Sequence, residues 1–442
     1  MGTTMTQTND LAQRRARRQA VLAGIGDGVA VLATSAEVVR NRDSHYPYRF
    51  DSHFHYLSGF AEPEAVLVLH GQSGRSILFC REKDPEREIW DGRRYGPDAA
   101  REAFGFDEAW PIAELDRRMP DLLADQSALH VILGDDPVWD RRVLGWLEAV
   151  RAQVRNGVSA PSALHDLRKR LDAMRLVKDA SELDVMQKAA DISALAHQRA
   201  MRATRPGMHE YEIEAELLYE FCRHGARSVA YNSIVAGGAN ACILHYVDNN
   251  ARLNDGDLLL IDAGCELAGY ASDITRTFPV NGRFDAAQRD VYACVLAAQA
   301  AALACVKPGA SWPDPHDAAV RVLAQGMLDW GLVQGSLDGV IESGAYKRFY
   351  MHRTGHWLGM DVHDVGDYRS GGQWQNLVPG MVLTVEPGCY IQAADDVPPA
   401  FRNIGIRIED DVVVTADGHH VLTAGTPKQI VDIEQLMTGQ GG

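Results

Sequence analysis

The chain has 442 residues, of which 46% are hydrophobic and 24% are charged. This composition is typical of a soluble globular protein of about two domains, and it excludes a disordered chain, a collagen-like repeat and a bundle of membrane-spanning helices. The formal net charge is −16, so we expect no nucleic-acid partner and no membrane partner. The acidity is concentrated after residue 174, where 34 acidic residues face 21 basic ones.

The first residues contain a pattern that loosely resembles an export signal. Arginines within 14–18 precede a fairly apolar run, 20–34, but Asp27 and three glycines interrupt it and no clear cleavage site follows. We therefore expect an amphipathic helix that leads into a strand at 29–33. Seven scattered cysteines without a CxxC pair indicate reduced thiols rather than a disulfide framework. These features together predict a cytoplasmic protein.

Residues 1–175 are expected to form an α/β domain. Between 29 and 170, short apolar runs alternate with helical patterns, which is typical of a central sheet covered by helices. Further strands are expected at 65–71, 75–80 and 128–134. A basic stretch, 162–178, is predicted to be helical and to end this domain.

Residues 176–442 are expected to form a second domain of the α+β class. Asp179 and Glu182 match a D-x-x-E capping box, which opens a long helix. Helices are expected at 181–204, 209–224, 285–306 and 315–331. Strands are expected at 228–236, 257–263, 272–280, 381–386 and 404–415. Helices and strands thus come in alternate groups, as in α+β domains.

Two segments of the second domain resemble each other. Residues 256–264 (GDLLLIDAG) and 380–388 (GMVLTVEPG) share the pattern Gly-x-apolar-Leu-x-apolar-acid-x-Gly. Each segment ends a strand with a carboxylate, and a second carboxylate follows on a later strand. These acidic residues are Asp262 and Asp273 in the first copy, and Glu386 and Glu409 in the second. The pattern predicts one strand-pair unit used twice, with a chance match over nine positions as the alternative.

The expected burial of these carboxylates makes them candidates for a site. Asp262 ends a run that is apolar on both faces, where an ionised carboxylate is costly unless it is paired or bound to a metal. Side chains alternate along a strand, so Arg407 and Glu409 share one face, which points either inward or to solvent. Separate structural salt bridges would explain each acid alone. As a group beside histidines, the four acids match the ligands of a pair of divalent cations.

A histidine-rich segment, 351–366, lies between the two acidic pairs. It contains His352, His356 and His363, and its glycines indicate a loop or short strands, so the spacing of its first two histidines is not that of a helical ligand pair. The HExxH, GxSxG and Walker motifs are absent. For any one of these histidines alone, a place in the core is the alternative to a place in a site.

This set of residues resembles the pita-bread metallopeptidases, a family that includes methionine aminopeptidase, prolidase and aminopeptidase P. The matching ligand positions, within IDAG, SDITR, GHWLG, EPG and RIEDD, are Asp262, Asp273, His356, Glu386 and Glu409. The resemblance to aminopeptidase P extends over nearly the whole chain. Residues 41–69 are similar to the N-terminal domain of that subfamily, and the IWDGRR segment at 89–94 also matches it. It implies an α/β N-terminal domain followed by an α+β pita-bread catalytic domain.

The resemblance also implies two divalent metal ions. Asp262 would chelate one ion, and His356 with Glu386 would hold the other. Asp273 and Glu409 would bridge the two. A hydroxide between the ions would attack the carbonyl that precedes proline, and Glu386 would carry the proton to the leaving nitrogen. The oxygen-rich ligands suit Mn²⁺ or Co²⁺, and the subfamily implies Mn²⁺.

Further catalytic residues are implied by the same resemblance. His245, His352 and His363 match histidines that face the substrate, where they would orient the peptide or stabilise the oxyanion. Arg407 matches a position beside the bridging Glu409, where it would fix that carboxylate and contact the substrate.

Three aromatic residues are weaker candidates for contact with substrate. Two of them are Tyr231 and Tyr368. Trp90 resembles a residue that reaches into the active site of a neighbouring subunit, with a surface or core aromatic as the alternative. The resemblance therefore implies a homo-oligomer, either a dimer or a tetramer.

The implied activity is that of an Xaa-Pro aminopeptidase, which acts on peptides with proline at the second position. The alternative is a prolidase, which has the same metal site and accepts only Xaa-Pro dipeptides. The segment 367–377 departs most from the family pattern, which leaves the shape of the pocket open there. A non-catalytic binding protein and a creatinase-type hydrolase are disfavoured, because such relatives lack the ligand set that is present in this chain.

Overall fold

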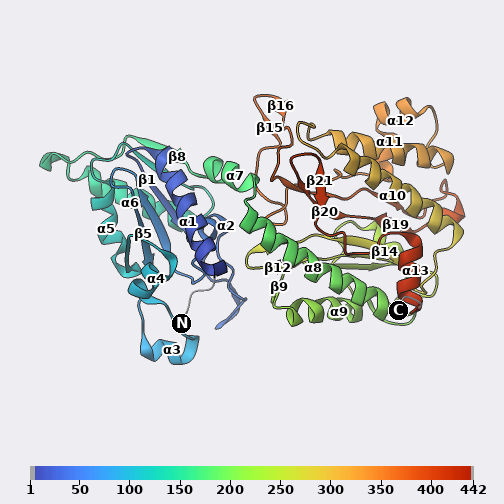
Figure 1. Ribbon diagram of the computed structural model, residues 1–442, viewed down its shortest axis with the longest axis horizontal. Coiled ribbons are helices and arrows are strands. Elements are labelled where there is room, and N and C mark those ends of the chain that lie inside the picture. The colour runs from blue at the N-terminus through green and yellow to red at the C-terminus, as the bar shows by residue number, and fades with distance from the viewer. Residues whose placement is uncertain (1–4, 440–442) are drawn as a thin grey trace. The chain divides into compact units, whose positions relative to one another are not determined.

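The computed structural model describes residues 5–439, and the chain divides into two compact units, residues 1–172 and 173–442 (Figure 1). The sequence-based boundary lies three residues further on. Within the described residues, every helix is too short or too polar to pass through a bilayer.

The first unit contains a six-stranded mixed sheet in the order β6-β5-β4-β1-β7-β8. Its strands are β1 (Val29–Ala33), β4 (Val66–His70), β5 (Arg75–Cys80), β6 (Glu108–Pro111), β7 (Ala128–Val131) and β8 (Ala163–Asp166), with a separate hairpin of β2 (Val39–Asn41) and β3 (Ser44–His45). Its helices are α1 (Met5–Ile25), α2 (Ser52–Ser58), α3 (Pro85–Asp91), α4 (Gly96–Phe104), α5 (Leu115–Leu123) and α6 (Pro137–Arg151). The α/β class predicted for this part is confirmed.

One face of this sheet packs on α5 and α6. Val31 and Val68 from the sheet share an apolar cluster with Leu123 and Trp146 from the two helices. Full burial of such side chains stabilises the fold by about 1.5–3 kcal/mol each. The helix predicted over 162–178 is wrong at its start, because its first residues pair in parallel with β7 and form the edge strand β8. Helix α7 (Arg168–Leu176) occupies the remainder.

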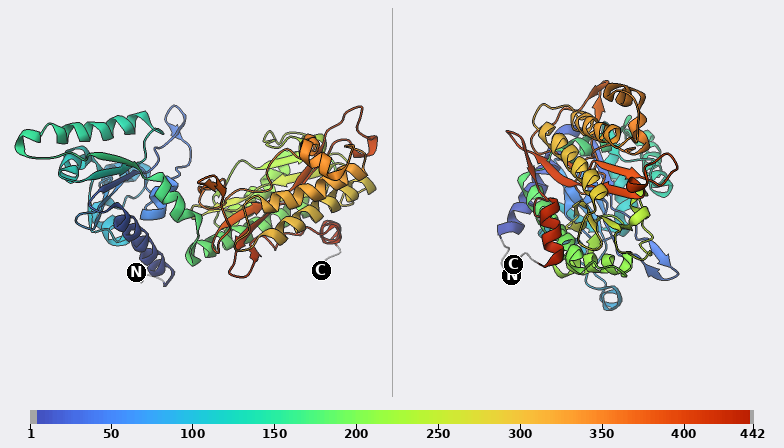
Figure 2. Two further views of the ribbon diagram at one scale, coloured as in Figure 1. Left: turned by 90° about the horizontal axis from the view of Figure 1, so that it is seen from above. Right: turned by 90° about the vertical axis from the view of Figure 1, so that its right-hand side faces the viewer.

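The second unit contains long helices and small antiparallel sheets. Its helices are α8 (Ala180–Ala203), α9 (Glu210–Arg223), α10 (Ala286–Cys305), α11 (Asp314–Asp329), α12 (Leu337–Ser343) and α13 (Ile430–Thr438). Its strands are β9 (Ser228–Val229), β10 (Ile234–Gly237), β11 (Leu258–Asp262), β12 (Cys265–Leu267), β13 (Tyr270–Ala271), β14 (Thr275–Pro279), β15 (Arg369–Ser370), β16 (Gln373–Trp374), β17 (Val382–Val385), β18 (Gly388–Ile391), β19 (Ile404–Arg407), β20 (Asp410–Val414) and β21 (His419–Val421). The four predicted long helices are present, and α10 and α11 lie side by side (Figure 2).

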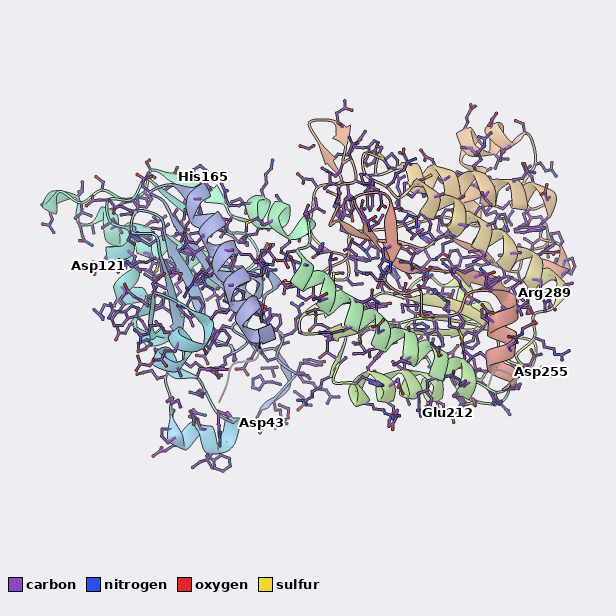
Figure 3. The ribbon with its side chains drawn as sticks, in the orientation of Figure 1. Asp43, Asp121, His165, Glu212, Asp255 and Arg289 are labelled. Atoms are coloured by element: carbon purple, nitrogen blue, oxygen red, sulfur yellow. The ribbon has the colours of Figure 1, made fainter. Side chains whose placement is uncertain are left out.

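The helices and the sheets of this unit enclose one large apolar core. Helix α8 begins with the predicted capping box, in which Asp179 accepts from the backbone of Glu182 and Glu182 accepts from the backbone of Asp179. Charged side chains such as Glu212, Asp255 and Arg289 lie on the outside of the unit (Figure 3). Carboxylates in its interior are therefore exceptional and need partners.

The two similar segments occupy equivalent places in two strand pairs. Strand β11 pairs with β14, with Asp262 opposite Thr275, and β17 pairs with β20, with Val385 opposite Asp410. In each copy one acid lies at the end of the first strand, and the other lies just before the second strand. The amide of Glu409 donates to the carbonyl of Thr275 and joins the copies. All four carboxylates therefore come to neighbouring strand ends.

The strand predicted over 404–415 is wrong in one respect, because it is two strands. Strand β19 pairs with β18, and β20 pairs with β17, so the ladder breaks at residues 408–409. The opposite chain carries Glu386 and Pro387 at this point, and a proline has no N–H to continue a ladder. The break frees two ligand positions, Glu386 and Glu409, from regular strand geometry.

Candidate metal centre

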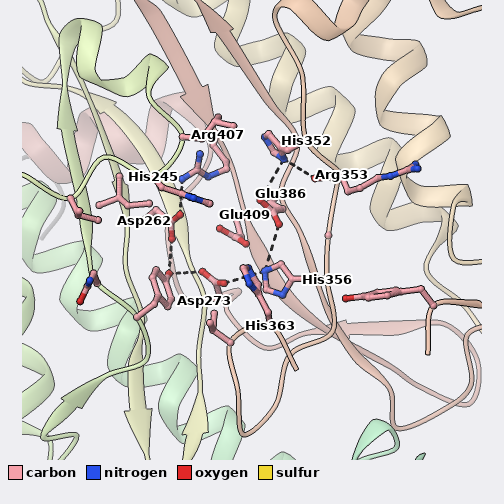
Figure 4. A pocket seen from close by; sticks show the side chains of 18 of the residues that line it. His245, Asp262, Asp273, His352, Arg353, His356, His363, Glu386, Arg407 and Glu409 are labelled. Atoms are coloured by element: carbon pink, nitrogen blue, oxygen red, sulfur yellow. Dashed lines mark hydrogen bonds and ion pairs between the residues drawn. The ribbon is translucent and has the colours of Figure 1, made fainter. Parts of the chain in front are cut away.

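A pocket of about 690 Å³ lies in the second unit (Figure 4). Its lining includes the five expected ligands, which are Asp262, Asp273, His356, Glu386 and Glu409. The other catalytic residues expected from the sequence, His245, His352, His363 and Arg407, line it too. The structure thus brings together residues that are spread over 165 positions of the chain.

His356 lies at the centre of the acidic group. Its Nε2 atom is 3.5 Å from Asp273 Oδ2 and 3.6 Å from Glu386 Oε1. Donor atoms of Asp273, His356 and Glu409 all lie within 4.8 Å of one another. The His356 amide donates to Thr384 Oγ1 at 3.1 Å. Gly355 permits this approach, because a Cβ atom there would lie 2.1 Å from the carbonyl oxygen of Thr384.

Tyr231 holds two of the carboxylates from the opposite wall. Its hydroxyl lies 2.6 Å from Asp262 Oδ1 and 2.5 Å from Asp273 Oδ1. Burial and the nearby carboxylates raise the pKa of Tyr231 well above its usual value, so the hydroxyl stays protonated and serves as a donor. Tyr231 thus contacts two of the expected ligands, whereas the sequence indicated it only as a weaker candidate for contact with substrate.

Arg407 pairs directly with Asp262 rather than with Glu409. Its Nη2 atom donates to Asp262 Oδ2 at 2.6 Å, and its Nε donates to Thr275 Oγ1 at 3.0 Å. Thr275 in turn donates to Glu409 Oε2 at 2.5 Å. Arg407 is thus linked to Glu409 only through Thr275. The alternation of side chains along the strand predicted that Arg407 and Glu409 share a face, but it did not predict that Arg407 pairs with Asp262.

The charges of the group favour an added cation. Burial and repulsion from the other acids raise the pKa of Glu409 well above its ordinary range. Burial, against the opposing effects of His356 and Arg407, raises the pKa of Glu386 to about 7. Burial alone would lower the pKa of His356, but the contact with Asp273 and the charge of Glu386 outweigh it and raise this pKa to about 9.

Burial is the largest influence on the raised pKa values of Glu386 and Glu409, and the neighbouring acids, against burial, raise the pKa of His356. Four carboxylates share the pocket with two guanidiniums, of Arg353 and Arg407, and with four imidazoles. Hard oxygen ligands beside an imidazole suit divalent cations. A divalent ion would replace the proton that the pocket now favours on His356, and it would neutralise the buried acids. The residues present therefore fit a metal centre.

The three expected substrate-facing histidines differ in what they contact. His352 Nδ1 donates to the Arg353 carbonyl at 2.7 Å, and its Nε2 is 2.8 Å from the hydroxyl of Tyr390. Both ring nitrogens are thus engaged, and burial and the charge of Arg407 lower the pKa of His352 to about 3. Within residues 5–439, the rings of His245 and His363 show no hydrogen bond to the protein, which leaves their nitrogens available to a peptide.

A buried ion cluster supports the loop that carries His363. Asp364 is buried and accepts from Lys178 Nζ at 2.9 Å and from Arg175 Nη2 at 2.5 Å. Arg175 also pairs with Asp361. Both basic residues lie just before α8, so the start of the second unit fixes a loop of the pocket.

Several supporting residues escaped the sequence analysis. Tyr390 joins Arg407 to His352, since Arg407 Nη1 donates to its hydroxyl at 2.9 Å. His197 is fully buried and its Nε2 contacts the carbonyl of Ala263, the residue after Asp262. Asp411 accepts from the amide of Asp273 at 3.0 Å. A signal existed only for Tyr390, which follows Glu386 by four residues.

The two remaining aromatic candidates have different places. Tyr368 lines the pocket, and its hydroxyl accepts from the amide of Trp357 at 3.2 Å. Trp90 lies on α3 in the first unit and is 84% exposed.

Comparisons with known proteins agree with this centre. The family model described as Metallopeptidase family M24 matches residues 184–416, and the one described as Aminopeptidase P, N-terminal domain, matches residues 14–132. The chain is 47% identical to the Xaa-Pro aminopeptidase of Haemophilus influenzae over 95% of this chain and 96% of the relative. The fold of the second unit is that of a metallopeptidase, and the chain belongs to metallopeptidase family M24.

Solved structures show the same similarity. The aminopeptidase PepP of Pseudomonas aeruginosa is 50% identical, with a TM-score of 0.94 over 96% of this chain and 97% of that chain. A Zn substituted Escherichia coli aminopeptidase P in complex with product is 44% identical, with a TM-score of 0.95 over 98% of this chain and 99% of that chain. The predicted pita-bread architecture is thereby confirmed.

Proposed function

We propose that this chain is an Xaa-Pro aminopeptidase, which hydrolyses the bond between an N-terminal residue and a following proline. The observation that carries the proposal is the convergence of all five ligand positions in one pocket. The similar proteins described above are named Xaa-Pro aminopeptidase or aminopeptidase P, which supports this activity over that of a prolidase.

The residues of the chain have distinct tasks in this reaction. Asp262, Asp273, His356, Glu386 and Glu409 would hold two divalent ions, for which we propose Mn²⁺. Such ions lower the pKa of a bound water and polarise the scissile carbonyl when they are present. Glu386 would accept a proton from the attacking water and return it to the leaving nitrogen. His245 and His363 orient the peptide, while His352 fixes Tyr390 and Arg407.

A comparison of peptide lengths tests the proposal. We expect cleavage of Ala-Pro-Ala, loss of that activity after chelation, and recovery with added Mn²⁺. Ala-Pro is the matched dipeptide, and activity on it alone would favour a prolidase. Activity that survives complete removal of divalent ions, verified by elemental analysis, would contradict the metal-dependent mechanism.

We further propose residues 1–175 as the N-terminal domain and 176–442 as the catalytic domain, supported by family matches that fall within these ranges. A cytoplasmic location is supported by seven cysteines that are all free thiols. Cell fractionation with an antibody against the chain would test the location.

We propose that the enzyme acts as a homo-oligomer through α3. Ile89 and Trp90 are 81% and 84% exposed there, and large exposed apolar residues are typical of interfaces. Trp90→Ala should remove about 2 kcal/mol or more of association free energy, so light scattering after size exclusion should show smaller particles at equal concentration. Val154→Ala, at another exposed apolar position of the same unit, is the control. An unchanged particle mass for Trp90→Ala would contradict this interface.

A further inference from the structure

The wall of the pocket beside His356 is aromatic. Trp312, Tyr368 and Trp374 all line the pocket. The rings of Trp312 and Tyr368 lie 4.7 Å apart, and both contact the buried Trp357, at 4.2 Å and 5.5 Å. Because Trp357 follows His356 directly, this wall adjoins an expected metal ligand.

The wall is built by two chain segments that hold each other. The amide of Trp312 donates to the carbonyl of Gln375, and the amide of Gln375 donates to the carbonyl of Tyr368, each at 2.9 Å. Ser311 and Asn376 form an antiparallel bridge next to these bonds. The loop before α11 and the β15–β16 hairpin thus form one continuous surface.

The hairpin sequence determines where Trp374 points. Gly371 and Gly372 both have positive φ, of 58° and 81°, which is the conformation of a two-residue type I′ turn. This turn places Arg369 opposite Trp374 in the ladder. The guanidinium of Arg369 covers the indole at 4.1 Å from the ring centroid, so one face of the indole is occupied and the ring is held at the pocket.

We propose that Trp312, Tyr368 and Trp374 form a subsite that selects peptides with an apolar side chain at their first or their third residue. This inference rests on the proposed function and adds to it a preference for particular peptide side chains. The charged residues at one end of the pocket are those proposed to carry out the reaction. The three rings have no part in that proposed mechanism, and they present an apolar surface to the pocket. An aromatic or branched aliphatic side chain of the substrate buries this area and is attracted to the rings.

Two peptide series and one variant test the subsite. The first series is Xaa-Pro-Ala and the second is Ala-Pro-Xaa, each with Phe, Leu, Ala or Ser as Xaa. In the wild type, kcat/KM for Phe should exceed that for Ser by about tenfold or more in one series, and that series assigns the wall to the first or to the third residue of the peptide. In Trp374→Ala this ratio should fall by about five- to tenfold, while Trp374→Phe retains it.

The design separates selectivity from folding and from activity. The ratio of two substrates is independent of the fraction of active enzyme, so a partly unfolded variant still reports it. Gln373→Ala is the matched control, because this neighbour on the same strand is exposed and does not line the pocket. Unchanged ratios in both series for Trp374→Ala would overturn the subsite. A wild type that cleaves no Xaa-Pro peptide would instead refute the proposed function on which it rests.

Discussion

Glu386→Gln is expected to lower kcat by about 10²–10⁴-fold, which is the range that a positioned proton carrier contributes. Glu386 lines the pocket, and its Oε1 lies 3.6 Å from His356 Nε2. From this place it would take the proton of the attacking water and pass it to the leaving nitrogen. Glutamine has the same shape and keeps an oxygen for the metal, but it cannot carry the proton.

The measurement must separate proton transfer from folding and from metal loss. Circular dichroism and thermal unfolding should show a native fold for Glu386→Gln, and elemental analysis should show retained divalent ions. Glu342→Gln is the matched control, because Glu342 lies exposed on α12, and it should have the kcat of the wild type. A kcat for Glu386→Gln within a few-fold of the wild type would refute the proton-carrying role.

Two of the expected ligand positions were predictable from the residue pattern alone, because each is an acid at the end of an apolar strand. Asp262 and Glu386 end apolar strands, where a carboxylate needs a partner, and these two strand ends come from similar segments. The similarity predicted that both copies deliver acids, and the pairing of β11 with β14 and of β17 with β20 places those acids together.

The hydrogen-bond partners of these residues were harder to predict. The alternation of side chains along a strand shows which residues point to the same side, but not which atoms come within bonding distance. Arg407 shares a face with Glu409 in the pattern, yet the ladder breaks between them and the arginine pairs with Asp262. Tyr390 and His197 act through tertiary contacts with Arg407 and Ala263, for which a single sequence has no periodic signal. The edge strand β8 was missed because its pairing with β7 overrides local helical preference.

Arg276→Met is expected to destabilise the second unit by about 3–5 kcal/mol, the cost of breaking a fully buried ion pair. Arg276 and Asp410 are both completely buried, and Nη2 donates to Asp410 Oδ1 at 2.7 Å. Burial raises the pKa of Asp410, but Arg276 and Lys428 outweigh it and lower this pKa below its ordinary value of 3.8. The stabilisation is therefore complete above about pH 4 and is lost as the pH falls further, so the variant and the wild type should converge in acid.

Urea unfolding at pH 7 measures this difference, with Arg289→Met as the matched control. Arg289 pairs with Glu434 at a partly exposed position, where an ion pair contributes about 1 kcal/mol or less. Equal free energies of unfolding for the two variants would contradict the importance of the buried pair.

The same substitution should also weaken metal binding, although Arg276 contacts none of the ligand oxygen atoms. Its Nη1 donates to the backbone carbonyl of Glu409 at 2.5 Å, and its Nε donates to that of Pro427 at 3.0 Å. The guanidinium thus ties the strand break that carries Glu409 to the segment before α13. A ligand that binds only the folded state stabilises it by an amount that increases with the logarithm of its affinity. Added Mn²⁺ should therefore raise the Tm of Arg276→Met less than that of Arg289→Met, and an equal increase would show that the tie acts on the fold alone.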